Sequence, residues 1–85
     1  VYPDPGAQAA RCLEIIAQAL DDAGASLDAV VRTRTYLVDA SDWEAVGREH
    51  GRVFGDARPA STMIVCAGLL DDRWLVEMEA EAVIG

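Results

Sequence analysis

Three glutamates near the end of the chain are the residues best suited to acid–base chemistry. Glu77, Glu79 and Glu81 occupy every second position, so in an extended strand their carboxylates share one face. Arg32 and Arg34 have the same spacing earlier in the chain. If the two segments are neighbouring strands, the arginines and glutamates pair across the sheet. Otherwise the carboxylates face solvent or a cleft, where one could act as a general base.

Other reactive side chains are few and scattered. The single histidine, His50, falls on the apolar side of a helical pattern, where we expect it to pack rather than to bind a metal. Cys12 and Cys66 lack a metal-ligand spacing and are interpreted as reduced, buried thiols of a cytoplasmic protein. Ser61 has no histidine or lysine placed to activate it, which argues against a serine hydrolase. We therefore expect no metal and no cofactor.

The composition indicates one small acidic domain. The chain has 85 residues and a net charge of −8, and we assign residues 1–85 to a single domain. The negative charge argues against binding to nucleic acid or to anionic membranes, and no apolar run approaches the length of a membrane span. So short a chain buries only about 60% of its unfolded surface, so we expect self-association to stabilise the fold.

Two segments have the apolar periodicity of amphipathic helices. In residues 6–23, apolar side chains recur every three or four positions, and Gln8 falls on the polar side. Residues 41–54 form the second helical pattern, and Ser41 and Glu44 have the spacing of a capping box at its start.

Three further segments have the character of β-strands. Residues 30–38 and 74–84 alternate between two faces, whereas residues 61–67 are apolar on both and need cover on both sides. The order of elements favours parallel pairing of the first two strands through a right-handed crossover, and we expect the last two strands to form an antiparallel hairpin. These rules predict an α+β two-layer sandwich with two helices on one face of a mixed sheet.

Four stretches, in this order and spacing, resemble the Rid (reactive intermediate deaminase, YjgF-type) family. They are AGASLDAVVRTRTYLVD at 23–39, DWEAV at 42–46, FGDARPA at 54–60 and VEMEAEAV at 76–83. The resemblance covers nearly the whole chain. It implies a chorismate-mutase-like fold and a homotrimer with ligand clefts between neighbouring subunits. It also implies an N-terminal β-hairpin before the first helix, which we expect to be missing from this chain.

The resemblance also implies a set of site residues. Glu77 opens the family's E-x-E-A motif, which makes it the candidate general base or anchor for the attacking water. Ser61 stands where the family has a carboxylate-binding arginine, directly after Pro-Ala, and Met63 stands in place of the archetype's cysteine. Gly47 corresponds to the archetype's helical asparagine. Arg58 is the only arginine near the Pro-Ala motif and either binds a substrate carboxylate instead or is a surface residue.

Two functional hypotheses follow from the resemblance. Archetypal members hydrolyse reactive enamines and imines to 2-keto acids and ammonia, so the chain is expected to be a deaminase of this kind, from a subgroup that lacks the arginine and has a different substrate. The alternative is a non-catalytic homotrimer that binds a small metabolite between its subunits. For Glu77, an ion pair with an arginine remains the alternative to catalysis.

Overall fold

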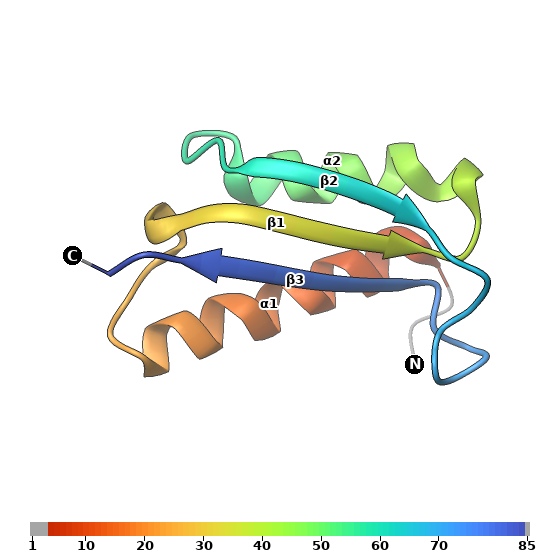
Figure 1. The fold of residues 1–85 in the computed structure, drawn as a ribbon, viewed down its shortest axis with the longest axis horizontal. Helices are drawn as coiled ribbons and strands as arrows, with labels where there is room; N and C mark the ends of the chain where they lie inside the picture. Colours follow the sequence, from red (N-terminus) through yellow and green to blue (C-terminus); the bar gives the residue numbers. More distant parts are fainter. Residues whose placement is uncertain (1–3, 85) are drawn as a thin grey trace.

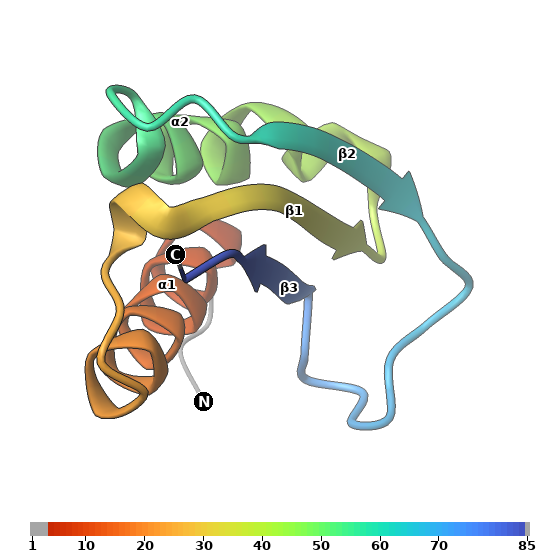
Figure 2. The same ribbon diagram turned by 60° about the vertical axis from the view of Figure 1, so that its left-hand side comes forward.

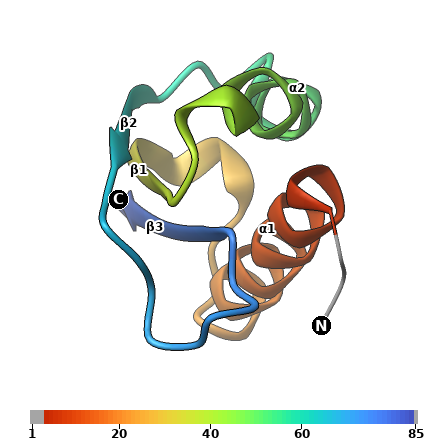
Figure 3. The same ribbon diagram turned by 90° about the vertical axis from the view of Figure 1, so that its right-hand side faces the viewer.

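The fold is a two-layer α+β sandwich in which two helices cover one face of a three-stranded mixed sheet (Figures 1 and 3). This confirms the fold class predicted from the sequence. The computed structural model describes residues 4–84. In chain order the elements are α1 (Pro5–Asp22), a 3₁₀ turn (Leu27–Ala29), β1 (Val30–Leu37), a second 3₁₀ turn (Ala40–Asp42), α2 (Trp43–Phe54), β2 (Ala60–Val65) and β3 (Val76–Ala82).

The local sequence defines both the start and the end of α1. The Asp4 carboxylate accepts a hydrogen bond from the Ala7 N–H at 2.8 Å, and Pro5 is the first helical residue. At the other end Gly24 adopts a φ of 78°, which glycine reaches without steric cost and which ends the helix. α1 is therefore fixed by local sequence at both termini.

The start of α2 differs from the predicted capping box. Ser41 lies in the preceding 3₁₀ turn, where both its N–H and its hydroxyl donate to Asp39 Oδ1 at 2.9 and 2.8 Å. A hydrogen bond to an ionised carboxylate is stronger than one between neutral groups. The Ser41 hydroxyl is therefore engaged by Asp39, and Asp42 becomes the N-cap of α2 without a side-chain bond.

β1 is the central strand, and the strand order is β2-β1-β3. β1 pairs with β2 in parallel, as predicted, and with β3 antiparallel. The expected hairpin between the last two strands is wrong, because the loop of residues 66–75 carries the chain past the end of β1 to the far edge of the sheet (Figure 2). Consecutive strands neighbour one another in only about two-thirds of cases.

The helix-facing side of the sheet forms the core. Thr33, Thr35 and Leu37 of β1 are buried there, beside Val76 of β3. A register shift at the start of β1 buries Val30 and leaves Val31 exposed. The helices contribute four buried apolar residues, which are Ala9, Leu13, Val46 and Phe54.

Candidate functional site

The face of the sheet away from the helices carries a ladder of charged side chains. Arg32 lies opposite Glu81 and Arg34 opposite Glu79 in the β1–β3 register. Their charged groups approach to 3.2 Å and 3.9 Å, respectively. The cross-sheet pairing that the sequence spacing allowed is therefore present for these two glutamates. Both pairs are partly exposed, so each contributes little stability.

Glu77 has a different neighbour on the same face. The residue opposite it is Tyr36, and the Tyr36 hydroxyl donates to Glu79 Oε1 at 2.8 Å instead. Within residues 4–84 Glu77 makes no hydrogen bond and no ion pair. Two arginines thus match two of the three glutamates, and Glu77 is the unmatched carboxylate of the ladder.

Glu77 also borders an open groove between α1 and the free edge of β3. The groove has a volume of about 520 Å³. Burial raises the pKa of the Cys12 thiol, and the nearby Glu77 charge raises it further. The residues that line the groove are mostly apolar; they are Gln8, Arg11, Cys12, Ile15, Ile16, Trp74, Val76, Glu77 and Met78.

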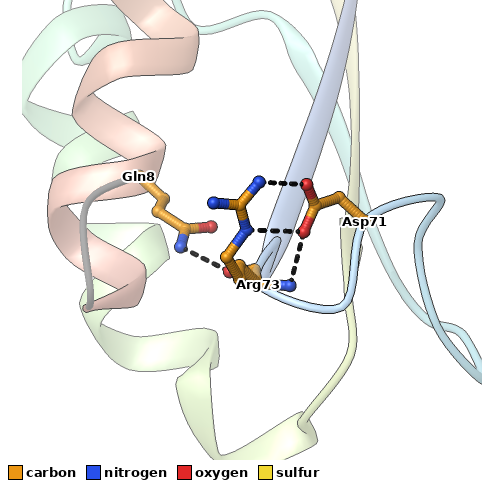
Figure 4. Close-up of polar contacts among 3 residues, drawn as sticks. All are labelled: Gln8, Asp71 and Arg73. Atoms are coloured by element: carbon orange, nitrogen blue, oxygen red, sulfur yellow. Dashed lines mark hydrogen bonds and ion pairs between the residues drawn. The ribbon is translucent and has the colours of Figure 1, made fainter.

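The loop that leads into β3 is fixed by polar contacts at one end of this groove (Figure 4). Gln8 Nε2 donates to the Arg73 carbonyl at 2.9 Å, and the Leu75 N–H donates to Gln8 Oε1 at 2.7 Å. Hydrogen bonds from the Arg73 side chain, at 3.0 and 2.7 Å, lower the pKa of Asp71 to about 2. These contacts hold Trp74 at the groove.

Gln8 is the residue that the sequence pattern misassigned. It was expected on the polar side of the first helix, yet it is buried. The Gln8 amide forms hydrogen bonds with the Arg73 carbonyl and the Leu75 N–H. It thus takes the place of a neighbouring strand at these two backbone groups. No local signal reveals this, because the bonded groups are more than sixty positions away in sequence.

Ser61 and Met63 lie far from Glu77 in the single chain. They pair with Thr33 and Thr35 of β1 and so belong to the helix-facing side of the sheet, whereas Glu77 belongs to the other side. Met63 packs beside α2: its Cε would lie 3.6 Å from a Cβ placed on Gly47. The two sets of predicted site residues therefore occupy opposite edges and opposite faces of one sheet.

Arg58 is also remote from Glu77 within the chain. It precedes β2 at the end of the sheet where Ala60 pairs with Arg32, whereas Glu77 pairs with Tyr36 near the other end of β1. Arg58 is exposed and has a φ of 48°. A site that combines Arg58 or Ser61 with Glu77 thus needs a second copy of the chain.

β2 itself is an exposed edge strand. Met63, Ile64 and Val65 are 36%, 38% and 56% exposed, although they are apolar and point to both faces. An apolar strand with a free edge is a typical surface for pairing with another chain.

His50 is half-buried and packs against other side chains, as the sequence indicated. Its Nε2 lies 2.7 Å from Thr33 Oγ1, and its ring contacts the Phe54 ring in a tilted arrangement with a centroid distance of 4.8 Å. Burial lowers the pKa of His50. In the described part of the chain, His, Cys, Asp and Glu side chains form no group of three that could hold a metal ion.

Comparison with protein families gives a match over nearly the entire chain. The model of the endoribonuclease L-PSP family matches residues 1–84. A protein of Streptomyces coelicolor is 37% identical over 82 residues, which are 96% of this chain and 61% of that protein. A RutC family protein of Pyrococcus abyssi is 37% identical over 75 residues, covering 88% of this chain and 58% of the relative. The chain thus spans about 60% of the length of these relatives.

Solved structures resemble the fold closely. The crystal structure of a YjgF family member from Mycobacterium tuberculosis superimposes with a TM-score of 0.96 at 42% identity, covering 99% of this chain and 71% of that one. A yeast structure superimposes with a TM-score of 0.91 at 26% identity, covering 96% and 65%. Neither of the two helices described between residues 4 and 84 has the length and hydropathy of a membrane-spanning segment.

Proposed function

Because the chain belongs to the endoribonuclease L-PSP family, which contains the YjgF and Rid proteins, we propose that it is a hydrolytic deaminase of small enamines and imines. The observation that carries this proposal is the unmatched Glu77. On a sheet face where both arginines are paired with other glutamates, Glu77 alone keeps a carboxylate free for a substrate. A general base must be able to reach the proton that it accepts.

Glu77 is proposed to carry the proton through the reaction. An enamine first gains a proton on carbon and becomes an iminium ion. Water then attacks the iminium carbon while the Glu77 carboxylate accepts a proton from that water. Glu77 returns the proton to nitrogen, and the carbon–nitrogen bond breaks as the hydroxyl group on the same carbon loses its proton to solvent. This released proton balances the one that the enamine took up from solvent, and the products are a carbonyl compound and ammonia. One carboxylate thus serves as base and then as acid, and no redox step occurs.

The site is proposed to lie between subunits of a homotrimer. Ser61 and Met63 are on one edge strand and Glu77 is on the other, so neighbouring copies in a closed ring could bring them together. The exposed apolar strand β2 supports this assembly, because its side chains would be covered by the next subunit. In this arrangement one subunit supplies Glu77, and its neighbour supplies Ser61, Met63 and Arg58.

The charge distribution does not support RNA cleavage, despite the name of the family. The chain carries a net charge of −8. Six of its seven arginines are already within 4 Å of a carboxylate. Binding to a phosphate backbone depends on free cationic side chains that displace counterions. A small-molecule substrate fits this surface better than RNA does.

A second candidate is a binding trimer without turnover. The observation that favours it is Ser61, which supplies no positive charge at the position where the family places an arginine. Such a protein would bind a small metabolite in the same clefts. The two free cysteines, Cys12 and Cys66, suit a reducing compartment, so we propose a cytoplasmic location for either function.

Release of a carbonyl product from an enzymatically generated imine tests the proposal. We expect the wild-type protein to accelerate hydrolysis of at least one imine in a panel above the buffer rate. Glu77→Gln, which keeps the shape but not the charge, should lose at least about 100-fold in rate. Glu81→Gln is the matched control, because Glu81 lies on the same strand face but is paired with Arg32. Equal rates for both variants would remove Glu77 from the mechanism.

A further inference from the structure

The hydroxyl of Tyr36 lies among the charged side chains of the ladder. It donates to Glu79 Oε1 at 2.8 Å, although Arg34, at 3.9 Å from the same oxygen, already supplies Glu79 with an opposite charge. A hydrogen bond with the Tyr36 side chain raises the pKa of Arg34. The phenol oxygen therefore contacts both a guanidinium and a carboxylate. Tyr36 is only half-buried, and Glu79 is exposed, so a small molecule can reach this hydroxyl.

The same hydroxyl lies close to Glu77. Tyr36 is directly opposite Glu77 in the antiparallel register, and the Cβ atoms of such a pair are about 5 Å apart. Glu79, which the hydroxyl contacts, shares a strand face with Glu77 and follows it by two positions, a distance of about 7 Å along the strand. A small substrate can therefore contact the Glu77 carboxylate and the Tyr36 hydroxyl at the same time.

Hydrolysis of an enamine requires proton transfers at two adjacent carbon atoms. The terminal carbon must gain a proton before water can attack the neighbouring carbon, and Glu77 is proposed to act on that water. A tyrosine hydroxyl is suited to the first transfer, because tyrosine normally carries its proton at neutral pH and can act as a general acid. The Arg34 guanidinium stabilises the negative charge that the departing proton leaves on the oxygen.

We propose that Tyr36 is a further catalytic residue, the general acid that protonates the carbon of an enamine substrate. The inference rests on the proposed deaminase function and assigns the proton transfer that Glu77 does not perform. The O–H bond of Tyr36 breaks, its proton forms a C–H bond with the electron pair of the enamine double bond, and the nitrogen lone pair completes the C=N bond of the iminium ion. The phenolate then takes a proton from solvent, which restores the hydroxyl, and no oxidation state changes.

Rates on an enamine and on a preformed imine separate this role from a structural one. A threonine dehydratase supplies the enamine 2-aminocrotonate, and an amino-acid oxidase supplies the imine of pyruvate, which needs no proton on carbon. Tyr36→Phe keeps the ring and removes only the hydroxyl. It should lower the catalysed rate above buffer about 100-fold for the enamine and change it less than about twofold for the imine. An equal loss on both substrates, or no loss on the enamine, would overturn the inference and leave the role of Glu77 intact.

The configuration of the product formed in heavy water tests the proton transfer itself. An acid held on one side of the substrate adds deuterium to one face of the enamine carbon, whereas solvent adds it to both faces. Lactate dehydrogenase and NADH trap the released 2-oxobutyrate as 2-hydroxybutyrate, in which proton NMR resolves the two hydrogen positions on that carbon. The wild type should give one configuration, and Tyr36→Phe should give both.

Glu79 is the competing acid on this face, and Glu79→Gln is the matched variant. A glutamine side chain can still accept the hydrogen bond from Tyr36, so this variant should keep the single configuration. Mixed configurations from the wild type, or from Glu79→Gln but not from Tyr36→Phe, would overturn the inference, while imine hydrolysis would still support the proposed function. A wild type that accelerates neither substrate would overturn the proposed function and this inference together.

Discussion

Tyr36 lies directly opposite Glu77 in the sheet, yet its hydroxyl donates to Glu79, one pair further along the strand. Glu79 therefore has two partners, the Tyr36 hydroxyl and the Arg34 guanidinium, and Glu77 has neither. This diagonal contact singles out one glutamate from three with identical spacing. It separates the two carboxylates that are paired across the strands from the one proposed to act on a substrate.

Gln8 is expected to stabilise the entry to β3. Gln8→Ala would leave the Arg73 carbonyl and the Leu75 N–H without their partner in a partly buried position. We expect this substitution to lower the free energy of unfolding by about 1–3 kcal/mol. Urea denaturation measures the loss. Gln18→Ala, on the exposed side of the same helix, is the control and should cost less than about 0.5 kcal/mol. Similar losses in both variants would contradict the assigned role of Gln8.

His50 is expected to make the fold less stable in mild acid. Burial lowers its pKa below the ordinary value of 6.5, so between the two values the unfolded chain binds more protons than the folded chain. The contribution of His50 is thus complete above pH 6.5 and is lost as the pH falls through the folded pKa. Melting curves from pH 7.5 to 5 should show falling stability in wild type. A flat profile in wild type, or an equal slope in His50→Gln, would contradict this assignment.

Strand β2 is expected to carry a subunit contact. Val65→Lys places a charge on the exposed edge strand and should dissociate the proposed trimer into monomers of lower melting temperature. Trp43→Lys makes a similar change at the start of α2, where the side chain is 59% exposed and does not line the groove beside Glu77, and should leave the assembly intact. Sedimentation analysis at micromolar concentration distinguishes the species. A monomeric wild type would refute the trimer, and a Val65→Lys trimer would exclude Val65 from the contact.

The local patterns in the sequence predicted the individual helices and strands better than they predicted which strands lie side by side. Alternation correctly placed Arg32 and Arg34 on the face shared by the glutamates, because side-chain direction in a strand depends only on position. The prediction of a hairpin between the last two strands was wrong, because β1 and not β2 lies at the centre of the sheet. The periodicity of apolar residues does not indicate which strand is central. The Ser41 capping box failed because Asp39, two residues earlier, offers a stronger acceptor.

In the candidate site, too, the sequence identified the residues but not their contacts with distant parts of the chain. The spacing of the glutamates allowed an ion pair for each of them and left catalysis open for Glu77. Only the register, with Tyr36 opposite Glu77, shows that Glu77 has no arginine partner across the sheet. The sequence also cannot show that Arg58 adopts a glycine-like conformation, since that depends on how α2 ends. In each case a contact between distant parts of the chain determines the chemistry of a residue that the sequence had already singled out.

The central claim is that one subunit supplies Glu77 and its neighbour supplies Arg58 to the same site. Restoration of activity in mixed trimers tests it most directly. Glu77→Gln and Arg58→Gly are each expected to hydrolyse slowly an imine that the wild-type protein accepts. After the two variants are unfolded together and refolded, hybrid trimers contain sites with both native residues. A cyclic trimer with random mixing should recover about a quarter of the wild-type rate. A mixture that is no more active than the mean of the two variants alone would contradict the shared site.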